Sequence, residues 1–301
     1  MSNNNQWTTK NIPDQSGKIV IVTGANSGIG YEAARALARK GATVIMACRS
    51  LDKGRSAWEK IEAENLDGTV TLLQLDLADL SSVKQFIEGF RSKYNRLDLL
   101  INNAGVMATP YGQTADGFEM QFGTNHLGHF ALTGQLIDLL KNAPKSRVVT
   151  VSSYTHHMGN INFDDLNSER SYQKWMAYGQ SKLANVLFAY ELQRRSARKE
   201  GNPLSIAVHP GYAATNLQHT TTFFRLLNPI MAQSQEMGTL PTLYAATHPE
   251  IRGGEYVGPD GFLGQRGYPK VTRSSKRSYD EATAKRLWEV SEELTGVKFD
   301  L

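Results

Sequence analysis

The stretch "KIVIVTGANSGIG", residues 18–30, decides the fold of this chain. Its first half is short, β-branched and apolar throughout, which is typical of a strand buried on both faces of a parallel sheet. Its second half is rich in glycine and is followed by a helical pattern over residues 31–41. Glycines at such a junction allow a tight turn and close approach of the backbone to a pyrophosphate at the helix N-terminus. The residues predicted to bind these phosphates are Gly24, Asn26, Ser27, Gly28, Ile29 and Gly30.

Buried-strand patterns alternate with helical patterns outward from this stretch, and one helical pattern predicts a long helix over residues 118–141. Six more strands are expected, over residues 43–50, 69–77, 97–105, 146–153, 204–211 and 253–259. This alternation predicts an α/β fold: a doubly wound, mostly parallel Rossmann sheet of about seven strands with helices on both faces. Without a linker-like break, residues 17–301 are expected to form a single domain after a polar N-terminal arm, residues 1–16. Residues 264–280 are basic and polar and are expected to form a surface loop, followed by an amphipathic packing helix.

Composition narrows the class of protein. The chain has 301 residues, 40% of them hydrophobic and 21% charged, with a formal net charge of +4. This mild, scattered basicity does not indicate a nucleic-acid partner. The single cysteine, Cys48, excludes an intrachain disulfide. Because no apolar run is long enough to cross a bilayer and the N-terminus has no signal-like core, we expect a cytoplasmic protein without a membrane anchor.

The end of the second predicted strand bears on which nicotinamide cofactor binds. Dinucleotide-binding folds that use NAD usually place an acidic residue there for the ribose hydroxyls. This chain has Cys48 followed by Arg49. A guanidinium can hold a 2′-phosphate through two hydrogen bonds, so NADP(H) is favoured over NAD(H). The alternative is a solvated loop arginine, and Cys48 itself is expected to be a small buried residue.

Further motifs follow the later strands, at the edge where ligands of open α/β sheets collect. They are "NNAG" at 102–105, "VSS" at 151–153 and "HPGYAAT" at 209–215. In "YGQSK", Tyr178 and Lys182 lie four residues apart on one helix face. This could be a surface tyrosine beside a solvated lysine. It could also be a phenol whose pKa, ordinarily near 10, is lowered by the ammonium so that the phenol can exchange protons.

Together with "TGANSGIG", Asp76 and Asn125, these motifs closely resemble the classical short-chain dehydrogenase/reductase family over residues 18 to about 215. "ACRS", "TNHLGHF" and "HPGYAATNL" are similar to the branch containing retinol dehydrogenases, the WW-domain oxidoreductase and the light-dependent protochlorophyllide reductases. The resemblance implies an NADP-dependent oxidoreductase that interconverts an alcohol with its aldehyde or ketone.

The resemblance also implies a role for each matched residue. Tyr178 would act as the acid/base, and Lys182 together with the charged nicotinamide would lower its pKa. Lys182 would also bind the nicotinamide ribose. Ser153, the second serine of the pair, would hold the substrate oxygen, and Asn125 would anchor a proton-relaying water chain; an ordinary helix-breaking Asn is the alternative. The other cofactor contacts implied are Asp76 and Leu77 at the adenine, Asn103, Ala104 and Gly105 along the cofactor, and Pro210, Gly211 and Thr215 at the nicotinamide amide.

The segment between Ser153 and Tyr178 departs from the family pattern. Compact members have a gap about half as long, so residues 154–175 are expected to be an insertion that shapes the substrate pocket. Residues 216–238 mix aromatics and leucines and are expected to be either a substrate lid or a packing helix. These apolar segments suggest a hydrophobic carbonyl or alcohol substrate, although the absence of the hydrophobic N-terminal anchor usual in membrane-bound retinol dehydrogenases argues against a retinoid. Members often pair, so a homodimer or homotetramer is expected.

Three alternatives remain at this point. A cofactor-binding regulatory or scaffold protein would keep the glycine turn but usually lose the Ser, Tyr or Lys. A sugar-nucleotide epimerase would typically space its glycines Gly-x-x-Gly-x-x-Gly. His126 and His129 have a spacing that could ligate a metal, but without acidic or cysteine partners they are expected to be packing residues, and no metal is predicted.

Overall fold

The computed structural model describes residues 6–211, 233–261 and 264–301. Its eight-stranded sheet has the order β3-β2-β1-β4-β5-β6-β7-β8. All neighbouring strands pair in parallel except β7 and β8, which are antiparallel. The strands are β1 (Ile19–Thr23), β2 (Thr43–Cys48), β3 (Thr69–Gln74), β4 (Leu99–Asn102), β5 (Arg147–Val151), β6 (Leu204–Val208), β7 (Tyr256–Pro259) and β8 (Pro269–Thr272).

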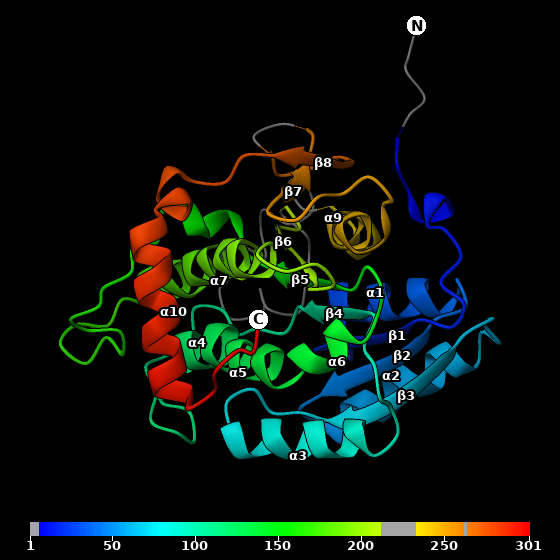
Figure 1. Ribbon diagram of the computed structural model, residues 1–301, viewed down its shortest axis with the longest axis horizontal. Helices are drawn as coiled ribbons and strands as arrows, with labels where there is room; N and C mark the ends of the chain where they lie inside the picture. The colour runs from blue at the N-terminus through cyan, green and yellow to red at the C-terminus, as the bar shows by residue number, and fades with distance from the viewer. Residues whose placement is uncertain (1–5, 212–232, 262–263) are drawn as a thin grey trace, which may run out of the picture.

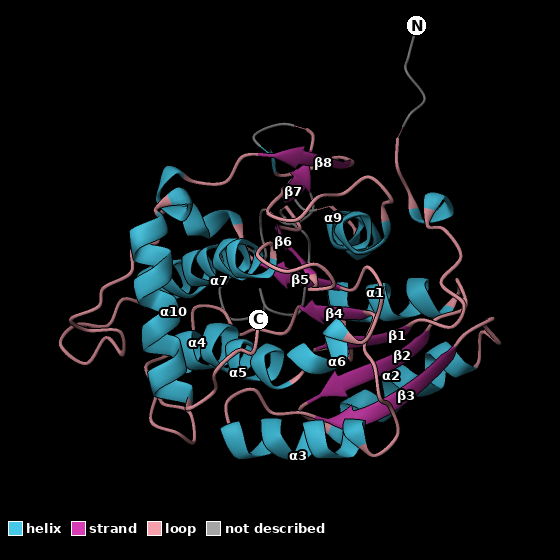
Figure 2. Ribbon diagram, viewed as in Figure 1, coloured by secondary structure: helices cyan, strands magenta, loops and turns pink. Residues whose placement is uncertain are grey.

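Helices cover both faces of this sheet (Figures 1 and 2). The α-helices are α1 (Gly28–Ala38), α2 (Leu51–Glu62), α3 (Leu80–Arg91), α4 (Met120–Phe122), α5 (Gly128–Gln135), α6 (Ile137–Lys141), α7 (Lys174–Ser196), α9 (Gln235–Thr247) and α10 (Glu281–Thr295). Short helical turns are η1 (Thr9–Asn11), the π-helical η2 (Gly123–Leu127), η3 (Tyr154–His157) and η6 (Lys276–Tyr279).

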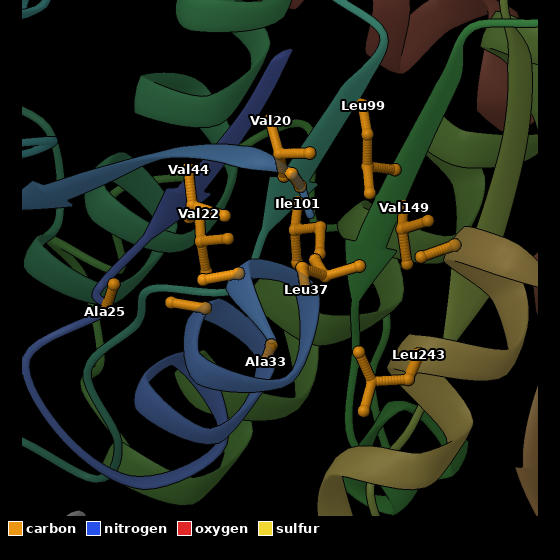
Figure 3. Close-up of a cluster of buried hydrophobic side chains, with 14 of the residues drawn as sticks. Val20, Val22, Ala25, Ala33, Leu37, Val44, Leu99, Ile101, Val149 and Leu243 are labelled. Atoms are coloured by element: carbon orange, nitrogen blue, oxygen red, sulfur yellow. The ribbon is translucent and has the colours of Figure 1, made fainter. Parts of the chain in front are cut away.

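Alternate residues of the buried strands face two separate cores. In β1, Val20 and Val22 pack with α1, α2 and α9, and this core is shown in Figure 3. Ile21 faces the opposite core, which is built with α3, α5 and α7. Trp288 of α10 is buried in this second core, as expected for a packing helix. The predicted strands β1, β2, β4, β5 and β6 are therefore buried on both faces, as the interior of a parallel sheet requires, whereas the edge strand β3 is only partly buried.

The strand order places the predicted motifs at one edge. The chain runs from β1 outward to β2 and β3, then returns to β4 on the other side of β1. The direction of winding therefore reverses between β1 and β4, and in such sheets a crevice opens at the carboxyl ends of these two strands. The glycine-rich turn follows β1, and the "NNAG" motif follows β4.

Two sequence predictions about these elements were wrong. Residues 264–280 were expected to be a surface loop, but β8 and η6 lie within them. Residues 118–141 read as one long helix, but η2 and a break at Leu136 divide it into α4, α5 and α6. Of the expected lid, residues 216–232 lie outside the described residues, and residues 235–238 form the first turn of α9.

Candidate active site

The glycine-rich turn fits the backbone geometry predicted for it. Gly24 and Gly28 have φ values of +68° and +60°, a region that favours glycine. A Cβ placed on Gly30 would lie 2.5 Å from both the Gly24 carbonyl oxygen and Asn103 Nδ2. Gly30 must therefore remain glycine for α1 to begin this close to β1 and β4. The N-terminus of α1 lines the crevice through Gly28, Ile29 and Gly30.

The ends of β1 and β4 are joined by the hydroxyl of Thr23. The backbone N–H groups of Asn103 and Ala104 both donate to Thr23 Oγ1 at 2.9 Å, and Asn103 Nδ2 donates to the Thr23 carbonyl at 2.8 Å. Thr23 was not predicted, because a threonine at the end of a β-branched strand looks like a strand residue. Its hydrogen bonds fix the "NNAG" backbone beside the glycine turn.

His129 continues this network into η2. Its Nδ1 lies 3.0 Å from the Asn125 carbonyl oxygen, which only accepts, so Nδ1 carries the proton. Nε2, 2.9 Å from Thr23 Oγ1, then accepts from the hydroxyl. His126 Nε2 lies 2.9 Å from Ser291 Oγ. Burial lowers the pKa of His126 to about 3 and that of His129 to about 4, so both are neutral packing residues, as expected.

Asn125 lies in the π-helical turn and clamps the backbone after β4. Its Oδ1 accepts from Val106 N at 2.8 Å, while Nδ2 donates to Val106 O and to Ser181 Oγ, both at 2.9 Å. A Cβ on Gly105 would lie 2.9 Å from Asn125 Oδ1 and 3.4 Å from Lys182 Nζ. Both N–H groups of the Asn125 amide and one acceptor position of its oxygen are thus used in holding the strand end beside Lys182.

Tyr178 and Lys182 are both buried in α7 rather than solvated. Lys182 Nζ lies 5.7 Å from the centroid of the Tyr178 ring and donates to the Val151 carbonyl at 3.2 Å. Burial raises the pKa of Tyr178 to about 12, opposed by a hydrogen bond with the Ser153 side chain. Burial lowers the pKa of Lys182 to about 8. The pKa of the Tyr178 phenol is therefore set by its burial and by the Ser153 hydrogen bond, with no lowering by Lys182.

The two serines after β5 have different surroundings. Ser152 is buried, and its hydroxyl donates to the Lys182 carbonyl at 2.7 Å. Ser153 is only half-buried, accepts from Thr155 N at 3.3 Å and hydrogen-bonds the Tyr178 side chain. Of the two serines, therefore, Ser152 uses its hydroxyl proton in a hydrogen bond to a backbone carbonyl, whereas the hydroxyl of Ser153 lies next to the phenol.

A cavity of about 640 Å³ at the carboxyl edge of the sheet brings the predicted residues together. Asn125 lies behind its lining, and Thr215 lies outside the described residues. The predicted residues that line it are Gly24, Asn26, Ser27, Gly28, Ile29, Gly30, Arg49, Asp76, Leu77, Asn103, Ala104, Gly105, Ser153, Tyr178, Lys182, Pro210 and Gly211.

Several lining residues were missed by sequence reasoning. Lys53 of α2 lines the cavity together with Arg49, and both side chains are exposed. Within the described residues neither forms an ion pair with a carboxylate. The aromatic and thioether side chains of Met107, Tyr154 and Trp175 line it as well. Lys53 could have been predicted as a lining residue, because it lies in the first turn of the helix that follows Arg49. Nothing in the sequence around Met107, two residues after "NNAG", marks it as a lining residue.

Cys48 fits its expected role as a small buried residue. It is 1% exposed, and burial raises the pKa of its thiol to about 11. Over residues 6–211, 233–261 and 264–301, the structure contains no group of three or more potential metal ligands. In the same ranges, no helix combines the length and apolarity that a membrane span needs.

Comparison with known proteins shows the family to which this arrangement belongs. The sequence model described as "short chain dehydrogenase" matches residues 18–223. Human retinol dehydrogenase 12 is 43% identical over 291 residues, covering 94% of this chain and 88% of that protein. Human retinol dehydrogenase 13 is 43% identical over 295 residues, covering 94% and 86%.

Solved structures agree with this assignment. An uncharacterised protein from Mycobacterium paratuberculosis has a TM-score of 0.83 and 44% identity, with 98% of this chain and 100% of that chain covered. The Pseudomonas aeruginosa RhlG/NADP complex shares the fold, with a TM-score of 0.63 and 20% identity over 81% of this chain and 94% of that one. This chain therefore belongs to the short-chain dehydrogenase family of oxidoreductases and is similar to the retinol dehydrogenases.

Proposed function

We propose that this protein is an NADP(H)-dependent oxidoreductase that interconverts a hydrophobic alcohol with its aldehyde or ketone. The observation that carries the proposal is the placement of Ser153, Tyr178 and Lys182 on the same cavity as the glycine-rich turn. A structural tyrosine–lysine pair would not need to face such a cavity.

The residues at the other end of the cavity fit a nicotinamide dinucleotide. The absent side chain at Gly30 and the open N-terminus of α1 suit a pyrophosphate. Arg49 and Lys53 place two cations beside the cavity, and the neighbouring Cys48 is a neutral thiol turned into the core. Arg49 directly follows β2, where folds that bind NAD usually place an acidic residue, and these two cations favour a 2′-phosphate over a free ribose hydroxyl. When bound, this cofactor supplies or accepts the hydride.

The chain's own groups would handle the substrate oxygen and its proton. With a pKa raised to about 12, Tyr178 holds its proton at neutral pH and can donate it to a developing alkoxide during reduction. Ser153 would orient the substrate oxygen through its hydroxyl, which already hydrogen-bonds the phenol. The ammonium of Lys182 would stabilise the phenolate left after proton donation.

The substrate side of the cavity favours an apolar molecule. Met107, Tyr154 and Trp175 line it, and the edge of the Trp175 ring system meets Tyr178, with centroids 6.3 Å apart at 77°. The names of the relatives at 43% identity denote retinol as their substrate. We therefore propose a hydrophobic alcohol or aldehyde and include a retinoid among the candidates.

The test is cofactor oxidation by the purified protein with NADPH and NADH in parallel, against aliphatic and aromatic aldehydes, ketones and retinal. The proposal predicts NADPH-dependent reduction of at least one hydrophobic carbonyl, with NADH clearly less effective. Tight NADPH binding without turnover on any carbonyl or, in reverse, any alcohol would instead support a regulatory cofactor-binding protein.

A further inference from the structure

His156 links the candidate catalytic serine to a distant part of the chain. It belongs to η3, the single turn that begins directly after Ser153, and its side chain is completely buried. One ring nitrogen, Nδ1, lies 2.6 Å from the Ser153 carbonyl oxygen. The other, Nε2, lies 3.0 Å from the backbone nitrogen of Ser275, just before η6. The imidazole thus bridges the active-site turn and the C-terminal segment.

The two partners fix the protonation of the ring. The Ser275 N–H can only donate, so Nε2 accepts and carries no proton. The Ser153 carbonyl can only accept, so Nδ1 carries the proton and donates. A doubly protonated ring would oppose its own N–H to the Ser275 N–H. The Tyr256 hydroxyl also approaches Nδ1, at 3.5 Å, which is much longer than the contact with Ser153.

These contacts act directly on the conformation of Ser153. Its carbonyl accepts from both the His156 backbone N–H, at 3.0 Å, and the imidazole. Its hydroxyl accepts from Thr155 N at 3.3 Å. A carbonyl held from two directions limits rotation of the Ser153 backbone, and the hydroxyl position follows from it.

The same C-terminal segment holds the insertion against α7 at a second point. The guanidinium of Arg277 donates to the Gly159 carbonyl at 2.8 Å. A Cβ on Gly159 would lie 2.3 Å from the Gly179 carbonyl oxygen, so the two glycines allow backbone contact immediately after Tyr178. Ser275 and Arg277, which lie outside the region that the family sequence model covers, therefore fasten the start of the insertion beside the phenol through His156 and Gly159.

We propose that His156 is a positioning residue for Ser153, and that residues 275–277 anchor it through the Ser275 N–H and the Arg277 guanidinium. This inference rests on the proposed function in one respect, the role of Ser153 at the substrate oxygen. The bridge itself can be tested without any substrate.

The first experiment reads the tautomer of His156 in the wild-type protein at pH 7.5. Long-range ¹H–¹⁵N spectra would be recorded, with the signal assigned by its loss in His156→Gln. The expected result is a protonated Nδ1 and an unprotonated Nε2. A protonated Nε2 would overturn the bridge, whether or not the protein proves to be an enzyme.

The second experiment separates the two hydrogen bonds by substitution. His156→Asn can retain a donor near the Nδ1 position, whereas His156→Gln can retain an acceptor near Nε2. With NADPH and the best carbonyl of the panel, we expect His156→Gln to lower kcat about tenfold through misplacement of Ser153, while the Kd for NADPH is unchanged. His156→Asn should retain more of kcat but unfold at a lower temperature.

The control for these variants is His157→Asn, in the same turn but exposed, whose kcat should stay within twofold of wild type. Equal kcat values for folded His156→Gln, His156→Asn and wild type would overturn the positioning role. No turnover by wild type, with the expected tautomer, would instead count against the proposed function alone.

Arg277 offers a test that leaves the core intact, because its side chain is exposed. Arg277→Ala should lower kcat about threefold to tenfold, Arg277→Lys should restore part of the loss, and the exposed neighbour Lys276→Ala should have no effect. Equal kcat values for Arg277→Ala and Lys276→Ala would show that the second contact does not position the site.

Discussion

Lys182 lies one turn beyond Tyr178 with its Nζ 5.7 Å from the centroid of the phenol ring, and both side chains are buried at the edge of one cavity. Burial moves both pKa values away from the charged forms, that of Tyr178 up to about 12 and that of Lys182 down to about 8. The Tyr178 phenol therefore keeps its proton at neutral pH, and the neighbouring Lys182 ammonium releases its proton more readily than an ordinary lysine does. This is the arrangement expected of a general acid with a proton supply behind it.

Cofactor choice is predicted to depend on the two cations at the end of β2 and the start of α2. Arg49→Ala and Lys53→Ala should each weaken NADPH binding about tenfold, and NADH binding much less, because only NADPH has a 2′-phosphate. Fluorescence titration with both cofactors measures this. Lys60→Ala, the same charge change farther along α2, is the control. Equal losses for NADPH and NADH would contradict a 2′-phosphate site.

Gly30→Ala is predicted to damage both stability and cofactor binding. The added methyl would lie 2.5 Å from the Gly24 carbonyl oxygen, and overpacking of this kind costs about 1–3 kcal/mol. Gly89→Ala is the matched control, because nothing lies within 4 Å of its Cβ inside α3. Removing this helix glycine should stabilise by about 0.5–1 kcal/mol. Urea unfolding distinguishes the two, and a harmless Gly30→Ala would show that the turn is looser than described.

Substitution of the two serines after β5 is predicted to have different effects: loss of the Ser153 hydroxyl should lower activity, and loss of the Ser152 hydroxyl should lower stability. Ser153→Ala should lower kcat about 10²-fold, since it removes a hydrogen bond to the reacting oxygen. Ser152→Ala removes the hydrogen bond to the Lys182 carbonyl and should cost about 1 kcal/mol of stability with kcat within a few-fold of wild type. Steady-state kinetics with melting curves checks both. The reverse pattern would assign the substrate oxygen to Ser152.

Stability is predicted to fall as the pH drops below about 6.5. His126 and His129 have folded-state pKa values of about 3 and 4, against about 6.5 when unfolded. The unfolded chain therefore binds more protons between these values, and the free energy of unfolding decreases from pH 6.5 towards pH 4. Urea titrations between pH 7.5 and 5 measure the slope. His126→Gln should make it shallower, and an unchanged slope would contradict a buried neutral His126.

Much of the fold follows from local sequence patterns. The strands β1, β2 and β4 were predictable because burial on both faces demands continuous apolar runs, and the glycine turn because its backbone angles demand glycine. Strand β8 was missed because it is an edge strand that pairs only with β7. Its last three residues, Lys270, Val271 and Thr272, are exposed, and only Val271 among them is apolar. The opposite edge strand, β3, could be predicted because Val70, Leu72 and Leu73 give it an apolar pattern that β8 lacks.

Most residues of the candidate site could be predicted from the sequence, but some of its local geometry and electrostatics could not. Arg49 and the glycines line the cavity because their motifs follow strand ends that the sheet gathers at one edge, and Tyr178 and Lys182 reach it from within α7. The π-helical turn at Asn125 had no signal, since a shift in hydrogen-bond register changes no residue type. The raised pKa of Tyr178 also escaped prediction, because it depends on how deeply α7 is buried.

The most direct test of the account is the Tyr178→Phe variant, measured for NADPH binding and for carbonyl reduction alongside wild type. Removal of the phenol hydroxyl should lower kcat about 10²–10⁴-fold, because the proton donor to the substrate oxygen is lost. The Kd for NADPH should remain within a few-fold of wild type. A Tyr178→Phe enzyme that reduces the same carbonyl at near wild-type rate would contradict the central claim that Tyr178 is the general acid.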